Sequence, residues 1–337
     1  MPKIQQQMNA RLRKFLGMEV EPPGQPFPAP VFIVGCMRSG TTFLVDKLTQ
    51  HPQLLKVGSE LREVWTRLGQ APCEGVCAYR DERYFSVEAA NNMTHYFSQY
   101  MRDARKLRRH AMRAKARLGK GQGAIFYDWK RVHPVNKSTQ LVNKIAYIHA
   151  LFPRAKIIFI IRSAYGQCSS MKSFIEHHYR QDGYIHYFPP EEGYSWTRIP
   201  EQEKTPDMQA DHIYPGNFSL IPRMWLRLNA VAFRQLQNLP EHSFRVVAYE
   251  DTVQQQASLL KQLFDFLELD PRHAARAERI AASVLSYKNT TTQGDPLQKW
   301  KKYLSEEEVA EIDRVLQAQA GEHEFILNSL EKWRIRP

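Results

Sequence analysis

The chain has few cysteines and lacks the long apolar runs of membrane proteins. Its 337 residues include four cysteines (Cys36, Cys73, Cys77 and Cys168), too few and too scattered for a disulfide scaffold. Cys73 and Cys77 have no second Cys or His pair nearby, so a zinc site is not expected. No stretch reaches the roughly 18–20 apolar residues of a membrane span. Residues 1–17 lack the apolar core of a secretory signal. We therefore expect a reduced, soluble, cytoplasmic protein.

Acidic residues are outnumbered by basic ones. The chain has 47 Lys and Arg against 35 Asp and Glu, a formal net charge of +12. This surplus favours anionic partners such as phosphate or sulfate esters, nucleic acid or an acidic membrane face. Part of it falls in residues 102–120, a predicted helix with nine basic residues and one acid, Asp103. That stretch is either a solvated helix face or a docking surface for an anionic acceptor.

The first residues predict a separate arm. Residues 1–20 place apolar side chains on one helical stripe, and the proline-rich segment 21–30 ends any helix there. Such a helix would either dock on the body or lie on a membrane surface as a basic anchor, so peripheral membrane contact is an alternative. We expect an N-terminal helical arm and linker over residues 1–27 and one large domain over residues 28–337.

Short apolar runs alternate with amphipathic helical patterns in the remainder of the chain. Runs of this kind predict strands that are buried on both faces, and alternation with helices predicts a parallel sheet. The fold class is therefore α/β, a P-loop-like parallel sheet with helices on both faces. The runs occupy residues 31–34, 54–57, 124–127, 156–161 and 244–248.

Residues 176–222 interrupt this alternation. The segment has little regular periodicity, and long insertions without periodicity are usually functional loops or disorder. Eight aromatic side chains make disorder improbable here. We expect an ordered lid or acceptor-pocket loop.

A phosphate-binding loop follows the first apolar run. Gly35 and Gly40 have the spacing of a Walker A loop, but Thr41 stands where that motif has its lysine. Because this lysine holds the β- and γ-phosphates, its replacement argues against ATP or GTP. Arg38 lies inside the loop instead, and Thr41 and Thr42 open a helix whose N-terminus attracts anions. The loop suits one phosphate-like group at a 5′ position.

The segment GCMRSGTTFL resembles the 5′-phosphosulfate loop of sulfotransferases that use 3′-phosphoadenosine 5′-phosphosulfate (PAPS). The resemblance is to the bacterial and carbohydrate-type branches of that family. It implies that the cofactor-binding residues of the loop are Arg38, Ser39, Gly40, Thr41 and Thr42.

The same resemblance implies a 3′-phosphate site. In IIRSAYGQCSSMKSF, Arg162 ends a predicted strand and Ser170 follows eight residues later. An arginine and a serine so placed can hold one phosphate from two sides. The C-terminal segment KNTTTQGDPLQKWKKYLSEEEVAEI also resembles the family. It implies that residues 286–300 cover the nucleotide, with Lys288 as a second cation. The resemblance extends from about residue 28 to 320.

The resemblance to the family implies some of the catalytic residues. NKSTQLVNKIAYIHALFPRAKIIFIIR places Lys137 on the family's lysine, which with Arg38 would stabilise the transferring group without a metal. Thr139 stands where the cytosolic small-molecule branch has its histidine. Glu60, after the second predicted strand, is the expected general base, with a pKa raised by partial desolvation. His133, predicted on a loop, is the alternative base.

These features predict an enzyme that moves a sulfuryl group from PAPS to a hydroxyl of an acceptor, with carbohydrate or lipid-linked acceptors favoured. One alternative is an ATP-dependent P-loop phosphotransferase, against which Thr41 and the lack of a clear Walker B aspartate count. Another is a basic nucleic-acid-binding protein, but no reader motif is present. The sequence identifies neither the acceptor nor the oligomeric state.

Overall fold

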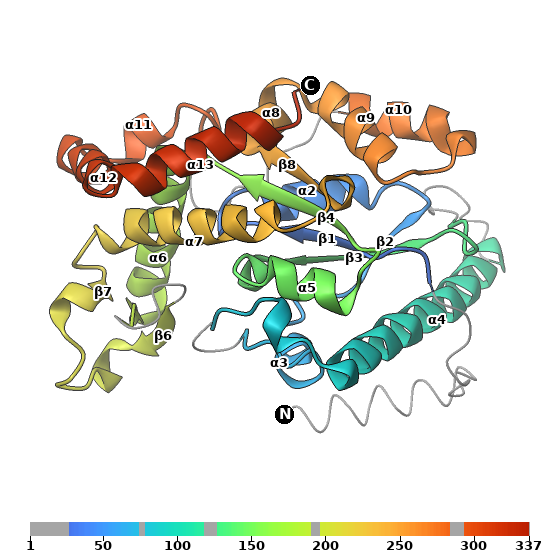
Figure 1. Ribbon diagram of the computed structural model, residues 1–337, viewed down its shortest axis with the longest axis horizontal. Helices are drawn as coiled ribbons and strands as arrows, with labels where there is room; N and C mark the ends of the chain where they lie inside the picture. The colour runs from blue at the N-terminus through green and yellow to red at the C-terminus, as the bar shows by residue number, and fades with distance from the viewer. Residues whose placement is uncertain (1–26, 74–77, 118–126, 190–195, 284–292, 337) are drawn as a thin grey trace.

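A five-stranded parallel sheet runs through the centre of the protein, shown in Figure 1 as a computed structural model. All four strand pairs of the sheet are parallel. The strands are ordered β2 (Leu54–Lys56), β3 (His133–Ser138), β1 (Val31–Val34), β4 (Lys156–Ile161) and β8 (Phe244–Ala248). The predicted parallel α/β sheet is confirmed.

The structure describes residues 27–73, 78–117, 127–189, 196–283 and 293–336. The predicted N-terminal arm over residues 1–27 lies outside the described residues except for Phe27, and Lys288 lies outside them as well. Within the described part of the chain, no helix is long and apolar enough to cross a membrane.

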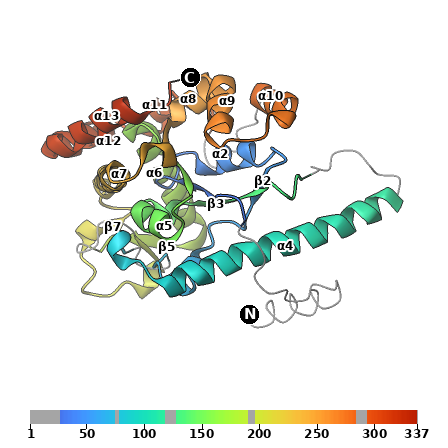
Figure 2. The same ribbon diagram turned by 45° about the vertical axis from the view of Figure 1, so that its right-hand side comes forward.

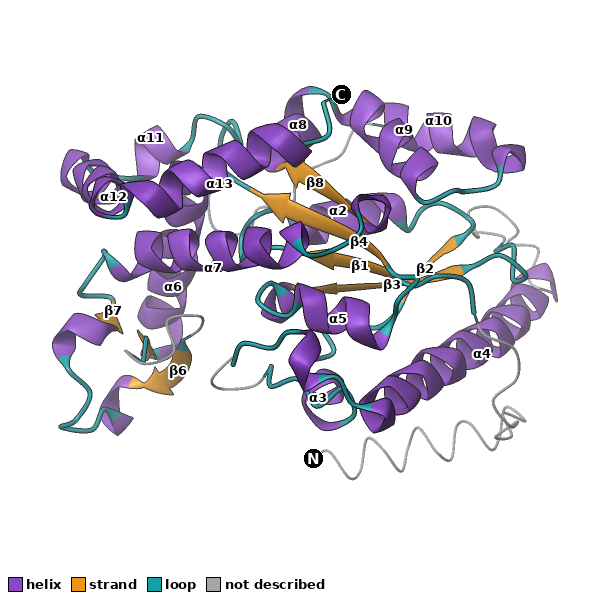
Figure 3. Cartoon of the chain, in the orientation of Figure 1, coloured by secondary structure: helices purple, strands orange, loops and turns teal. Residues whose placement is uncertain are grey.

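Alternate residues of the central strands pack into two separate hydrophobic cores, as expected for strands buried on both faces. Phe32 and Val34 of β1 pack into one core, whereas Val31 and Ile33 pack into the other. Helices lie on both sides of the sheet (Figure 3). The first core is covered by α4 (Val87–Arg117), α5 (Ile145–Leu151) and α7 (Leu220–Gln237), and the second by α2 (Thr41–Leu48), α9 (Gln256–Phe266) and α10 (Ala274–Ala282).

Figure 2 shows α4 as a long rod that passes beneath the sheet and beyond it. Residues 102–117 of the basic stretch fall in the second half of α4, and residues 118–120 lie outside the described residues. The role of the stretch as a docking surface stays a prediction. The other helices are α3 (Arg62–Arg67), α6 (Ala164–Asp182), α8 (Tyr249–Gln254), α11 (Trp300–Tyr303), α12 (Glu306–Ala318) and α13 (Ala320–Trp333).

The third strand differs from the prediction. Residues 124–126 lie outside the described residues and Tyr127 is in no strand, whereas β3 is formed by HPVNKS at His133–Ser138. Proline, asparagine and lysine are poor strand formers, so this segment lacks the apolar signature. Pairing with β1 and β2 on both sides makes it a strand nevertheless.

The described part of the segment 176–222, residues 176–189 and 196–222, contains a second sheet. Its first residues complete α6, and β5 (Tyr184–Tyr187), β6 (Thr197–Pro200) and β7 (Ile213–Tyr214) follow as a three-stranded antiparallel sheet in the order β6-β5-β7. Phe188 and Tyr214 are buried, and Trp196 packs against the same core. Aromatic packing therefore explains why the segment folds despite its weak periodicity. Its role as an acceptor loop stays a prediction.

Candidate active site

A tight loop joins β1 to α2 at the carboxyl end of the sheet. Arg38 and Gly40 both adopt left-handed conformations, with φ of +68° and +103°, and these turn the chain into the helix. A Cβ on Gly40 would lie 2.5 Å from the ring of Tyr249, and one on Gly35 would lie 2.3 Å from the carbonyl oxygen of Ile160. Both positions therefore require glycine because β4 and α8 pack directly against the loop.

The loop carries polar groups that fit an anion. The backbone N–H of Ser39 donates to the carbonyl of Cys36 over 3.1 Å, but the buried Ser39 Oγ has no hydrogen-bond partner among the described residues. The N-cap residue of α2, Gly40, makes no side-chain cap, and the first turn has no acidic residue. Thr41 is buried and Thr42 is exposed. An uncapped helix N-terminus beside an unpartnered hydroxyl is suited to a phosphate group.

Arg162 connects this loop to the end of the chain. It directly follows β4, and its Nη1 donates to the carbonyl of Arg38 over 3.2 Å while its Nη2 donates to the carbonyl of Pro296 over 3.1 Å. Its guanidinium lies 4.3 Å from the ring centroid of Tyr249. The side chain is thus buried and fixed on three sides, although no carboxylate of the described residues forms an ion pair with it.

Two further side chains join Arg162. Arg38 Nε donates to Ser170 Oγ on α6 over 3.1 Å, so the structure brings together the predicted pair Arg162 and Ser170 through Arg38. Lys299, just before α11, completes a group of three cations. Burial, followed by repulsion from Arg162 and Arg38, lowers the pKa of Lys299 to about 8.

The pKa of each arginine is also lowered, that of Arg38 by burial and by Arg162, and that of Arg162 by burial. Three neighbouring cations without an acidic ion-pair partner among the described residues are costly unless an anion binds them. Sequence reasoning missed Lys299 and named Lys288 in the same predicted loop. The QKWKK segment at the end of this loop was the available signal.

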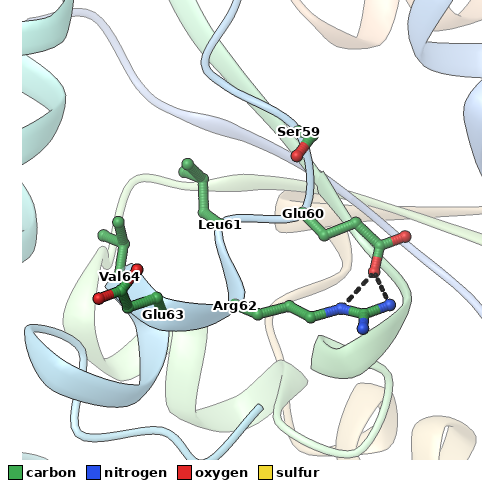
Figure 4. A pocket seen from close by; sticks show the side chains of 6 residues that line it. All are labelled: Ser59, Glu60, Leu61, Arg62, Glu63 and Val64. Carbon is green, nitrogen blue, oxygen red and sulfur yellow. Dashed lines mark hydrogen bonds and ion pairs between the residues drawn. The ribbon is translucent and has the colours of Figure 1, made fainter. Parts of the chain in front are cut away.

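A second group lies on the β2–β3 side of the loop, around Glu60. Lys137 Nζ is 2.7 Å from Glu60 Oε1, Thr139 Oγ1 donates to Oε2 over 3.1 Å, and Arg62 donates to Oε2 from Nε and Nη2 over 3.4 and 3.3 Å. Figure 4 shows the Arg62 contacts in an open pocket of about 450 Å³ lined by residues 59–64. The predicted residues Glu60 and Lys137 are therefore in direct contact.

Asn136 holds the turn that carries Glu60 in place. Its Nδ2 donates to the carbonyls of Val57 and Ser59 over 3.2 and 3.0 Å, and its Oδ1 accepts from Trp65 Nε1 over 3.1 Å. A buried amide on β3 thus fixes both ends of the turn before α3. This contact positions Glu60 beside the carboxyl end of β3, where Lys137 and Thr139 lie.

The expected direction of the Glu60 pKa is wrong for this state of the protein. Burial raises the pKa of the carboxyl, but Lys137, Arg62 and Thr139 together outweigh burial and lower it. Because the partners lie on two other segments, their combined effect could not be read from the strand pattern. Glu60 is consequently ionised at neutral pH.

His133 was predicted on a loop, but it lies in a strand and away from Glu60. It is the first residue of β3, and its Nδ1 lies 2.9 Å from the carbonyl oxygen of Ala29. Four residues of strand separate it from Lys137, which corresponds to about 13 Å. Lys137 is near the carboxyl end of β3. His133 therefore lies at the opposite, amino end of the strand.

The chain is similar to sulfotransferases in a family comparison and in a comparison with solved structures. Residues 30–189 match the model of a sulfotransferase family. The sulfotransferase domain from the curacin biosynthetic pathway is 17% identical, with a TM-score of 0.45 over 88% of this chain and 99% of that one. Sulfotransferase STF9 from Mycobacterium avium is 12% identical, with a TM-score of 0.46 over 93% and 78%. Mouse sulfotransferase SULT7A1 complexed with PAP is 11% identical, with a TM-score of 0.42 over 91% and 90%.

No curated protein sequence matches the chain. The family match covers the phosphate loop, the Glu60 turn, β3 and the segment from Arg162 to Ser170. The matched residues, just under half of the chain, are therefore similar to the sulfotransferase family.

Proposed function

We propose that this protein is a sulfotransferase, which moves a sulfuryl group from PAPS to a hydroxyl group of an acceptor. The observation that carries the proposal is the cluster of Arg38, Arg162 and Lys299 at the uncapped N-terminus of α2, beside the pair of Glu60 and Lys137. Three buried or half-buried cations suit a nucleotide with phosphates at two positions. When bound, PAPS supplies an activated sulfuryl group attached to a phosphate leaving group.

The nucleotide would be held at two ends. Arg38 and the loop residues Ser39, Gly40, Thr41 and Thr42 would bind the 5′-phosphosulfate. At the other end, Arg162 and Ser170 would bind the 3′-phosphate. Lys299 is close enough to Arg162 and Arg38 for their charges to lower its pKa. We add Lys299 to this set, and Lys288 stays a prediction.

The chemical step needs a base and two sites of positive charge. The acceptor hydroxyl oxygen forms a bond to sulfur as the bond from sulfur to the bridging phosphate oxygen breaks. The hydroxyl proton moves to the carboxylate of Glu60. The leaving phosphate keeps the electron pair of the broken bond, and Arg38 and the α2 N-terminus stabilise its charge. Lys137 neutralises charge on the transferring group.

No step of this scheme requires a metal, because fixed cations and backbone N–H groups act on both charged groups. Among the described residues, no group of three or more His, Cys, Asp or Glu side chains could hold a metal ion. The acceptor would approach through the open pocket at residues 59–64. A carbohydrate or lipid-linked acceptor is the favoured class, with the aromatic segment 176–222 as its further contact.

Calorimetry with three ligands tests the proposal. We expect adenosine 3′,5′-bisphosphate (PAP), the product nucleotide, to bind in the micromolar range, and ATP and a single-stranded oligonucleotide to bind far more weakly. ATP binding that exceeds PAP binding would favour the phosphotransferase alternative. Tight oligonucleotide binding without PAP binding would favour the nucleic-acid alternative.

A further inference from the structure

The ion pair between Glu60 and Lys137 conflicts with the two roles that the proposed reaction gives these residues. The atoms Lys137 Nζ and Glu60 Oε1 are 2.7 Å apart, and their side chains are only 11% and 19% exposed. While they are paired, the lysine charge is neutralised by Glu60 and is not available to the donor. The pairing also helps to lower the pKa of Glu60 and so weakens it as a base.

The two oxygens of Glu60 are held differently. Oε1 accepts from Lys137, whereas Oε2 accepts from Thr139 and from Arg62. Lys137 belongs to β3, Thr139 to the short 3-10 helix Thr139–Leu141 and Arg62 to α3. Among the described residues these three are the groups that face the carboxylate. Departure of Lys137 would therefore leave Oε1 without a donor while Oε2 stays fixed.

We infer that Lys137 exchanges partners when the donor binds, leaving Glu60 for the sulfonate and so turning Glu60 into an active base. This inference rests on the proposed function. The donor brings a negative group to the side of Lys137, and an ammonium group on a flexible stem can reorient toward it. Oε1 then becomes the proton-accepting atom, and Thr139 and Arg62 act as positioning residues that keep it aimed at the acceptor hydroxyl.

The exchange makes the base depend on the donor. Without PAPS, the carboxylate stays paired and has a low proton affinity. With PAPS bound, loss of the lysine contact and the nearby sulfonate charge both raise the proton affinity of Glu60. Adenosine 3′,5′-bisphosphate has no sulfonate, so in its complex Lys137 stays on Glu60.

Carbon-13 NMR of the full-length protein tests this exchange directly. Glutamate labelled at the side-chain carboxyl carbon is incorporated, and the Glu60 signal is assigned by its disappearance in Glu60→Gln. The midpoint of its titration is measured without ligand, with saturating bisphosphate and with saturating PAPS, all without acceptor. We expect similar midpoints in the first two states and a midpoint higher by about one pH unit or more with PAPS.

Lys137→Met separates the exchange from a simple field effect of the bound anion. In this variant the midpoint should be high already without ligand, and PAPS should move it by less than a third of the wild-type shift. A full shift in Lys137→Met, or equal midpoints in the bisphosphate and PAPS complexes of the wild type, would overturn the inference and leave the proposed function standing. Failure of both nucleotides to bind would overturn the proposed function itself.

The positioning role of Thr139 has its own readout. Thr139→Val should lower kcat by about tenfold or more while the KM for PAPS changes less than twofold, and Thr139→Ser should restore most of kcat, because a positioned base contributes about 10²- to 10⁴-fold. A merely structural role would not be rescued by the hydroxyl of serine. Equal kcat values in the valine and serine variants would overturn the positioning role.

Discussion

Arg38 Nε donates a hydrogen bond to Ser170 Oγ over 3.1 Å, across a separation of 132 residues in the sequence. The bond joins the phosphate loop to α6. It also joins a residue assigned to the 5′ end of the nucleotide with one assigned to its 3′-phosphate. Both ends of the proposed ligand therefore depend on one hydrogen-bonded connection, and variants at either end should affect nucleotide binding.

Arg162→Ala and Ser170→Ala should each weaken binding of adenosine 3′,5′-bisphosphate. A hydrogen bond to a charged group contributes about 1.5–3 kcal/mol, which is about 10- to 150-fold in Kd. The matched ligand is adenosine 5′-phosphate, which lacks the 3′-phosphate and should lose much less affinity in both variants. Calorimetry measures both. Equal losses for the two ligands would show that these residues do not act at the 3′ position.

Glu60→Gln should lower kcat by about 10²- to 10⁴-fold, because the amide keeps the shape of the side chain but cannot accept the proton. Binding of the bisphosphate should change little, since Glu60 lies on the Lys137 side of the site. His133→Ala is the control and should retain most of the rate, because His133 is at the amino end of β3, away from Lys137. A large loss in His133→Ala with near-normal turnover in Glu60→Gln would contradict the assignment.

Nucleotide affinity should fall as the pH rises through the alkaline range. Burial and the two arginines lower the pKa of Lys299 to about 8 without ligand. Below that pH the side chain is charged and attracts phosphate, whereas above it the free protein has lost this proton and must regain it on binding. Titration of bisphosphate affinity between pH 6.5 and 9.5 measures the effect. In Lys299→Met, affinity should be lower at neutral pH and the fall near pH 8 should be absent; an unchanged profile would exclude Lys299 from the site.

Gly40→Ala should destabilise the protein and weaken nucleotide binding. The added Cβ would lie 2.5 Å from the ring of Tyr249 at a φ of +103°, and overpacking together with a left-handed backbone costs about 2–5 kcal/mol. Gly183→Ala is the matched control. Gly183 has a φ of +67° and nothing within 4 Å of its added Cβ, so only the backbone cost of about 1–2 kcal/mol remains. Urea unfolding measures both, and equal losses would contradict this account of the loop.

Sulfuryl transfer should persist in the presence of a chelator. Arg38, Lys137 and the N-terminus of α2 supply the positive charge that a metal would otherwise provide. Transfer from labelled PAPS is measured with excess EDTA and then with added magnesium. Loss of activity that magnesium restores would contradict metal-independent transfer and favour the phosphotransferase alternative.

The phosphate loop and the strands beside it could be predicted because local sequence determines them. Val31–Val34 and Lys156–Ile161 are continuous apolar runs, and burial on both faces requires such runs. The Arg162 and Ser170 pair was implied by the resemblance of its segment to the sulfotransferase family. These features depend on few contacts outside their own segments.

Features that depend on tertiary pairing could not be predicted in this way. β3 is a strand because two neighbours pair with it, although Pro134 and Asn136 disfavour that conformation. The low pKa of Glu60 depends on Lys137, 77 residues away, and on Arg62. Lys299 enters the site because the chain returns past Arg162. The hydrogen bond from Arg162 to the carbonyl of Pro296 shows this return.

That return of the chain has a consequence for biosynthesis. The phosphate loop leaves the ribosome long before residues 249 and 296, but Gly40 packs on Tyr249 and Arg162 binds the carbonyl of Pro296. Contacts so distant in sequence form slowly, and domains of this size fold through intermediates. A nascent chain that ends before Pro296 should therefore be unable to hold the nucleotide. PAPS should protect from proteolysis only chains that extend past Pro296, because a ligand stabilises only the state that binds it.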